Sequence, residues 1–225
     1  MNTITTTILV IFGGTALLVV TAASACKPQE QLNGHEPQAQ ERPDGQQPQA
    51  QQSQSPKVRF DIAAQFTASG SMGDGEQGPK YIQLMEGWKD KPHSTPSCIK
   101  VIYSPGPNGW GGIYWQNKPD NWGDKPGEDF NHAGYKKLTF WARGETGDEL
   151  IEFKAGGINT LGKQYKDSFE ISAGKIQLEK EWKQYTLDLE GKNLSSVIGG
   201  FCWVAAKSAN LHGATFYLDD IDYEH

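Results

Sequence analysis

From Lys57 onward, the chain is a series of short segments in which apolar and polar residues alternate between turn residues. Alternation with a period of two predicts β-strands, because successive side chains of a strand point to opposite faces. No long segment has helical periodicity, so the sequence predicts an all-β domain, an antiparallel β-sandwich or jelly roll. The segments predicted as strands are Cys98–Tyr103, Leu138–Arg143, Glu149–Ala155, Trp182–Leu189, Phe201–Ala206 and Ala214–Tyr223.

The alternation also assigns side chains to faces. In two successive predicted strands, the positions opposite the apolar face are Trp141, Arg143, Glu152 and Lys154. Groups that hydrogen-bond hydroxyls, set beside a flat apolar ring, are what a sugar requires. We therefore expect these four residues to form part of one ligand-binding face, with Trp141 as the first candidate. The alternative is an ordinary solvated face.

The last predicted strand changes parity part-way along. Leu218 and Ile221 are both apolar, yet they fall on opposite faces of a regular strand. A β-bulge at Asp219–Asp220 would absorb the extra residue. Two adjacent carboxylates also offer hard oxygen ligands to calcium, although one Asp pair lacks the full ligand count that calcium needs. The alternative is a solvated pair that ends a strand.

Aromatic residues are densest between positions 110 and 122. Trp110, Tyr114, Trp115 and Trp122 lie there with Gly, Asn and Pro between them. Exposed rings of this kind can stack on the C–H faces of a pyranose. Trp115 shares a strand face with Ile113, which favours a core position for Trp115. Tyr114 and Trp122 are the candidates for ligand contact, the alternative being that they too fill the core.

The N-terminal segment reads as an export signal. Residues 8–25 are apolar, and Ala23-Ser24-Ala25 fits the pattern of a signal-peptide cleavage site. Cys26 follows directly, which resembles the lipobox of bacterial lipoproteins, in which this cysteine carries the lipid. Ala23 stands where a lipobox usually has Leu, and no Lys or Arg precedes the apolar run. Lipoprotein, secreted protein and uncleaved membrane anchor all remain open for residues 1–25, and all three place the rest of the chain outside the cytoplasm.

A linker separates this signal from the domain. Residues 27–56 contain ten Gln and five Pro in thirty positions and almost nothing apolar. Such a segment buries too little surface to offset its ordering entropy, so residues 26–56 are predicted to be a disordered tether. The β-sandwich domain is expected to span residues 57–225.

Composition narrows the classes of function. Of 225 residues, 36% are hydrophobic, and only one stretch is apolar enough to span a bilayer, which excludes a polytopic membrane protein. The formal net charge of -6 argues against nucleic acid as a partner.

The region from about Phe66 to Tyr223 resembles a family of extracytoplasmic bacterial domains related to carbohydrate-binding modules, in the galactose-binding-like group of β-sandwiches. The resemblance implies this fold and a polysaccharide or oligosaccharide partner. Such modules often hold a structural calcium between their first and last strands, which implies Asp219 or Asp220 as ligands with Asp74 as a partner. The segments that carry the resemblance are Ser69–Asp74, Cys98–Val101, Gly109–Gln116, Asn121–Gly123, Leu138–Gly144, Glu181–Leu189, Gly199–Val204 and Thr215–Ile221.

Two cysteines remain after Cys26. Cys98 and Cys202 both lie in predicted strands, and an oxidising compartment would allow them to form a disulfide. Two separately buried thiols are the alternative, and the sequence leaves both open.

Catalytic signatures are weak. No Ser lies in a G-x-S-x-G turn. A glycosidase needs only two suitable carboxylates, but Glu149 and Glu152 have opposite parity and Glu145 lies in a turn. We therefore expect a non-catalytic module, tethered at the cell envelope, that binds a polysaccharide by ring stacking and hydrogen bonding. The alternatives are a glycoside-active enzyme that uses the same face and an envelope module that binds a protein partner.

Overall fold

Strands account for nearly all regular structure in the computed structural model, which describes residues 59–94 and 96–225. The only helical elements there are the short helix α1 (Ile62–Gln65) and the 3-10 turn η1 (Asp74–Gln77). The strands are β1 (Phe60–Asp61), β2 (Thr67–Gly73), β3 (Ile82–Trp88), β4 (Cys98–Tyr103), β5 (Trp110–Gln116), β6 (Lys137–Gly144), β7 (Leu150–Gly156), β8 (Glu170–Gln177), β9 (Lys183–Asp188), β10 (Gly199–Ala206) and β11 (Ala214–Glu224).

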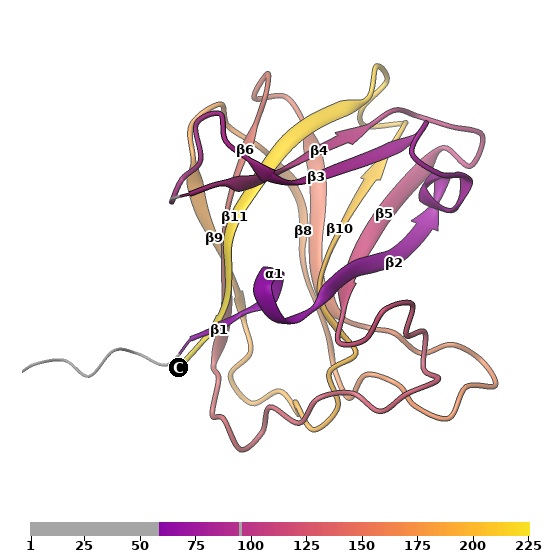
Figure 1. Cartoon of the computed structure of the whole chain (residues 1–225), viewed down its shortest axis with the longest axis vertical. Coiled ribbons are helices and arrows are strands. Elements are labelled where there is room, and N and C mark those ends of the chain that lie inside the picture. The colour runs from indigo at the N-terminus through magenta and orange to yellow at the C-terminus, as the bar shows by residue number, and fades with distance from the viewer. Residues whose placement is uncertain (1–58, 95) are drawn as a thin grey trace, which may run out of the picture. The chain divides into compact units, whose positions relative to one another are not determined.

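The strands form two antiparallel sheets (Figure 1). Sheet A has the order β3-β4-β11-β6-β9, and β1 also pairs with β11. Sheet B has the order β2-β5-β10-β7-β8. From β5 to β11, every connection except β7–β8 carries the chain from one sheet to the other, so the predicted antiparallel sandwich of jelly-roll type is confirmed.

The six predicted strands are all present, but β1, β2, β3, β5 and β8 are additional. β2 reads TASGSMG, and β8 is exposed along most of its length. Neither shows the apolar alternation of a half-buried strand. The predicted signal segment, Cys26 and the tether lie outside the described residues. Within the described part of the chain, no helix has the length and apolar character needed to cross a membrane.

The core lies between the two sheets and is rich in aromatic rings. Phe140 of sheet A has its ring centroid 4.7 Å from that of Phe153 and 5.0 Å from that of Phe201, both in sheet B. Trp115 is fully buried, as its parity predicted. The inward side chains of β6 and β7 are likewise fully buried, which confirms the faces read from the alternation.

The predicted bulge in β11 is confirmed. The register between β11 and β6 shifts between Asp219 and Asp222, and Asp220 has a φ of 45°. Because the bulge takes up the extra residue, both Leu218 and Ile221 point into the core with 0% and 1% exposure. The same shift leaves the two carboxylates at the bulge outside the core.

Asp222 pairs with Asp61 of β1 and is 3% exposed, and this environment makes stability depend on pH. Burial raises the pKa of Asp222 to about 6, although Arg59 at 3.1 Å opposes the shift. The folded state therefore binds more protons than the unfolded chain between about pH 4 and pH 6, and the free energy of unfolding falls as pH rises through that interval. Asp167 contributes in the same direction, since burial raises its pKa to about 6 as well.

We expect Asp222→Asn to remove part of this dependence, because Asn carries no proton to lose. Urea denaturation at several pH values between about 4 and 7 should show a smaller fall in unfolding free energy for the variant, by on the order of 2 kcal/mol. Equal slopes for the variant and the parent protein would contradict the assignment.

Candidate functional site

The four residues expected on one face lie on two opposite faces. Trp141 and Arg143 are on β6 in sheet A, whereas Glu152 and Lys154 are on β7 in sheet B. All four point away from the core. The expectation of a single face was wrong because the chain crosses between the sheets at the β6–β7 turn, so the outer sides of these strands are the two outer sides of the sandwich.

On the outer side of sheet B, residues distant in sequence come together. Cys202 of β10 pairs with Tyr114 of β5 on one side and with Lys154 of β7 on the other. Two residues further along β10, on the same side of the sheet, Val204 lies opposite Glu152. The register therefore places two predicted ligand-binding charges and the predicted aromatic residue on the same side of sheet B, with β10 between them.

A small apolar cluster forms the centre of this surface. Tyr114, Ile158, Ile198 and Cys202 are its buried members. Met72, Trp122, Tyr165 and Val204 pack on them and are only partly buried. We call these four partly buried residues, together with Glu152 and Lys154, the sheet B face.

Tyr114 supports this face and is not itself available to a ligand. Its ring is 5% exposed, and its hydroxyl donates to the Gly156 carbonyl at 2.9 Å. A Cβ on Gly199 would lie 2.8 Å from two ring carbons, so only glycine allows the ring to lie this close. Trp122 meets the ring edge-on with centroids 6.1 Å apart. Tyr114 is thus buried, which was the alternative expected from the sequence, whereas Trp122 is partly exposed.

The charged residues of the sheet B face are held in place by neighbours on β8. Ser172 Oγ donates to Glu152 Oε1 at 2.7 Å, and Lys154 Nζ lies 2.7 Å from Glu170 Oε1. Burial alone would lower the pKa of Lys154, but the Glu170 carboxylate outweighs it and raises that pKa. Lys154 is therefore a fixed positive charge at neutral pH, with 23% of its side chain exposed.

On sheet A, Trp141 is covered by residues 89–94, which we call the covering segment. His93 stacks on the Trp141 ring with centroids 3.7 Å apart and planes 16° from parallel. Trp182, before β9, donates its indole N–H to the Lys91 carbonyl at 3.0 Å. Trp141 therefore has one ring face occupied by the protein itself. No feature of the sequence pattern indicated this segment.

The bulge carboxylates hold the covering segment. Asp219 Oδ2 accepts the backbone N–H groups of His93 and Ser94, each at 3.0 Å. Asp220 accepts the Ser94 hydroxyl at 2.7 Å and lies 2.8 Å from His93 Nδ1. These partners are hydrogen-bond donors, whereas calcium would need further oxygen acceptors.

Asp74 is not near this pair. It is fully buried, and its carboxylate accepts the Tyr103 hydroxyl together with the N–H groups of Gly106 and Asn108. Tyr103 pairs with Ala214, five residues along β11 from Asp219, which is about 16 Å of extended strand. The three aspartates therefore do not fit the expected calcium site. In residues 59–94 and 96–225, no group of three or more His, Cys, Asp or Glu is arranged to hold a metal ion.

The expected alternative of a disulfide between Cys98 and Cys202 is contradicted. Both are free buried thiols. Cys98 is on the outer side of sheet A and Cys202 on the outer side of sheet B, so the whole core separates them. Burial raises the pKa of Cys98 to about 11 and raises that of Cys202 further.

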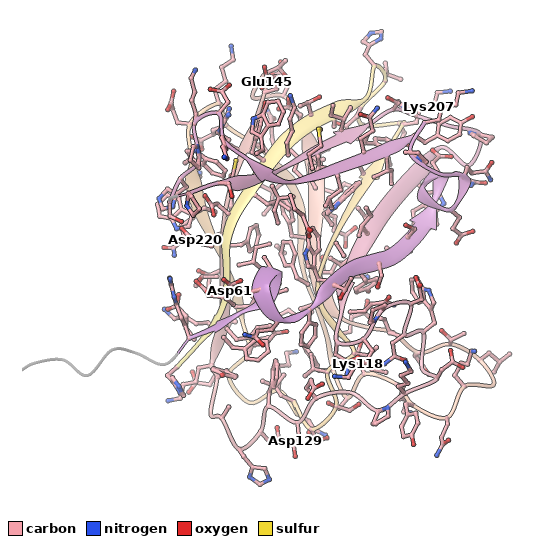
Figure 2. The ribbon with its side chains drawn as sticks, viewed as in Figure 1. Asp61, Lys118, Asp129, Glu145, Lys207 and Asp220 are labelled. Atoms are coloured by element: carbon pink, nitrogen blue, oxygen red, sulfur yellow. The ribbon has the colours of Figure 1, made fainter. Side chains whose placement is uncertain are left out.

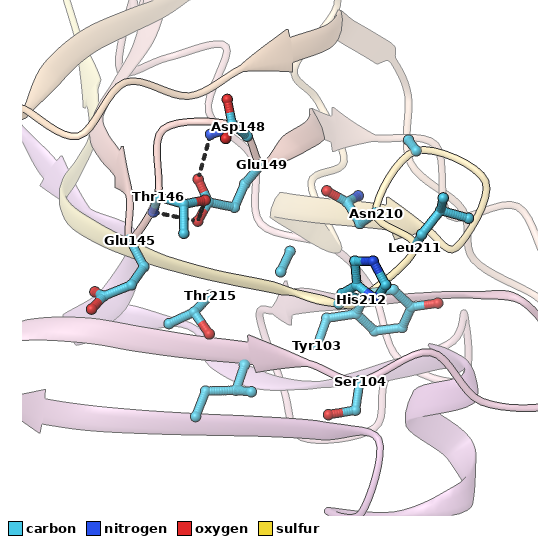
Figure 3. A pocket seen from close by; sticks show the side chains of 14 residues that line it. Tyr103, Ser104, Glu145, Thr146, Asp148, Glu149, Asn210, Leu211, His212 and Thr215 are labelled. Atoms are coloured by element: carbon cyan, nitrogen blue, oxygen red, sulfur yellow. Dashed lines mark hydrogen bonds between the residues drawn. The ribbon is translucent and has the colours of Figure 1, made fainter. Parts of the chain in front are cut away.

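Glu145 and Glu149 line one pocket, but each of the three carboxylates considered for catalysis is hydrogen-bonded within the protein. Glu145 accepts the Tyr217 hydroxyl at 2.7 Å on sheet A, whereas Glu152 is on sheet B. Glu149 is buried in a turn, where Thr146, Gly147 and Asp148 all donate to it (Figure 3). Burial alone would raise the pKa of Glu149, but these hydrogen bonds lower it.

That turn borders a pocket of about 480 Å³ at one end of the sandwich (Figure 3). Two of its polar lining residues are Glu149 and Asn210. Glu149 accepts hydrogen bonds from its own turn, and Asn210 bonds both the N–H and the carbonyl of Leu150. These bonds stabilise the end of the sandwich.

Comparison with known proteins gives structural matches only. No protein-family model matches the chain, and no curated protein does. Among solved structures, a family 30 carbohydrate-binding module is 13% identical, with a TM-score of 0.46 over 73% of this chain and 97% of that one. A family 11 module from a Clostridium thermocellum cellulosomal cellulase is 16% identical, with a TM-score of 0.46 over 75% and 94%. A xylan-binding domain from Paenibacillus barcinonensis is 10% identical, with a TM-score of 0.39 over 74% and 92%.

The separation of the two cysteines can be checked by peptide mapping of the full chain. After denaturation in the presence of an alkylating agent and without reductant, Cys98 and Cys202 should appear on two separately alkylated peptides. In the native protein both should react slowly, because the thiols are buried and their thiolates disfavoured. A peptide that joins the two cysteines would contradict the structure.

Proposed function

We propose that this protein is a non-catalytic carbohydrate-binding module and that the sheet B face is its binding surface. The observation that carries the proposal is the composition of that face. Partly exposed aromatic rings, Trp122 and Tyr165, lie on the same side of sheet B as a carboxylate and an ammonium group whose positions are fixed by partners on β8.

The chemistry of such a surface matches that of a sugar. A pyranose presents C–H groups on its faces and hydroxyls around its edge. Aromatic rings cover the first, and charged side chains bond the second as acceptors and donors. Glu152 accepts from hydroxyls and Lys154 donates to them. The resemblance read in the sequence supports the same class of ligand.

The proposal includes the N-terminal region. A polysaccharide offers repeated sites, and binding by a single open face is weak, so attachment to a surface would raise the effective concentration of the module. We propose that residues 26–56 tether the domain to the cell envelope through a lipid on Cys26.

A glycan and polysaccharide screen of the full chain tests the binding surface. We expect saturable binding that weakens about tenfold or more in Trp122→Ala, since a central aromatic contact is worth at least about 1.4 kcal/mol. Tyr165→Ala is a second variant on the same face, in case Trp122→Ala lowers the stability of the apolar cluster.

The matched control is Trp141→Ala, which removes the same side chain from the opposite side of the sandwich. It should bind a neutral glycan as the parent protein does. Loss of binding in Trp141→Ala with full binding in Trp122→Ala and Tyr165→Ala would place the ligand on sheet A. Turnover of the bound glycan would favour the glycoside-active enzyme, and the absence of any glycan ligand would favour a protein partner.

The tether has a separate test. Cys26→Ala should move the protein from the membrane fraction to the soluble fraction, because a lipid-modified cysteine would no longer exist. Retention in the membrane fraction would indicate an uncleaved anchor instead.

A further inference from the structure

A second polar site lies on the outer side of sheet A, around Arg143. This side chain is only 9% exposed, and its guanidinium lies 3.8 Å from the centre of the Tyr217 ring. The Trp182 ring is on another side, at 5.4 Å. A planar guanidinium stacks well on aromatic faces, so the two rings fix its position and orientation.

The guanidinium has no anionic partner. Among residues 59–94 and 96–225, none forms an ion pair with Arg143, and its Nε has no hydrogen-bond partner. Glu145 is two residues away, yet its carboxylate is bonded to the Tyr217 hydroxyl. Buried charges in proteins are normally paired, since an unpaired one loses its hydration without compensation. Nε is enclosed by protein, so an anion in the pocket that Arg143 lines would be bound by the terminal nitrogens of the guanidinium.

Arg143 lines a pocket of about 360 Å³, within the usual size range of small-molecule sites. Trp182 lines it as well, and so do Lys91 of the covering segment and Lys180. Glu145 also lines this pocket, and its label in Figure 2 shows where on the molecule the residue lies. The pocket is therefore formed by an aromatic ring, a buried guanidinium and further charged side chains.

The acidic residues of the pocket restrict the ligand. Asp90, Glu145 and Glu181 line it beside the three basic residues, so its formal charge is balanced. A pocket with balanced charge has no net attraction for a dianion such as phosphate. A molecule with a single carboxylate and several hydroxyls would instead place its carboxylate on the guanidinium and donate its hydroxyls to the acids.

We propose that this pocket binds a sugar acid through its carboxylate. The planar fork of Arg143 bonds the carboxylate in the bidentate manner that this pair favours. Trp182 covers the sugar ring, and the acids at the rim accept its hydroxyls. The site is distinct from the sheet B face, so the proposal does not rest on the function proposed there.

The covering segment maintains the pocket. Its residues 90–92 line one side, and the segment is held by the stacking of His93 on Trp141 and by the N–H groups that Asp219 accepts. Asp219 and Asp220 thus act as positioning residues for the pocket.

Isothermal titration of the full chain with D-glucuronate and D-galacturonate tests the proposal, with D-glucose and D-galactose as neutral matches. We expect saturable binding of a uronate, about tenfold or more tighter than its neutral match, because the difference is one charge-assisted pair with a fixed guanidinium. Inorganic phosphate, tested in parallel, should bind more weakly than the uronate. Phosphate binding as tight as the uronate would overturn the assignment to a sugar acid.

Arg143→Gln should abolish the preference for the uronate. Arg143→Lys should bind the uronate about tenfold more weakly than the parent protein does, because an ammonium keeps the charge but lacks the bidentate fork. Lys207→Gln is the matched control, since it removes one positive charge from an exposed side chain far along the chain from the pocket. It should leave uronate binding unchanged. Melting temperatures show whether each variant is folded, and Arg143→Lys keeps the test decisive if the Gln variant unfolds.

No saturable uronate binding by the parent protein, or uronate binding retained in both Arg143 variants, would overturn the proposal. These outcomes are separate from a failure of the sheet B face, which is read from Trp122→Ala with neutral glycans.

Discussion

The bulge in β11 is the constraint on which both the core and the outer side of sheet A depend. β11 is the longest strand, and it pairs with β4, β6 and β1. Without one extra residue at Asp219–Asp220, either the apolar residues before the bulge or those after it would point to solvent. The bulge keeps Leu218 and Ile221 in the core, and it presents two carboxylates outward, where they bind the covering segment over Trp141.

The two sides of the sandwich consequently differ in kind. Sheet A carries a segment that stacks on Trp141 and forms one side of a pocket beside Arg143. On sheet B, a small apolar cluster supports Trp122 and Tyr165. A sheet face suits an extended chain of sugars, whereas a pocket suits a single residue or a chain end. The two proposals therefore describe different contacts with a carbohydrate.

The sequence predicted the features that follow from strand periodicity. The side chains that face the core, the bulge and the burial of Trp115 all follow from alternation within one strand. The placement of Lys154 and Tyr114 on either side of Cys202 does not follow from alternation, because it depends on which sheet each strand joins. For the same reason, neither the separation of Trp141 from Glu152 nor the separation of the two cysteines was predictable.

The covering segment was not predicted, for a different reason. Residues 89–94 read KDKPHS, which has the composition of an ordinary exposed loop. Its position is fixed by contacts to residues more than a hundred positions away, such as Asp219 and Asp220. β2 and β8 were missed because glycine, serine and exposed polar residues fill the positions where alternation would appear.

We would test carbohydrate binding at the sheet B face first by nuclear magnetic resonance, through the indole N–H signals of the tryptophans. The chain has seven tryptophans, each with one such signal in a proton–nitrogen correlation spectrum. On titration with a neutral oligosaccharide that binds, we expect the Trp122 signal to shift while those of Trp141 and Trp182 stay in place. A shift of the Trp141 signal with none at Trp122 would contradict it.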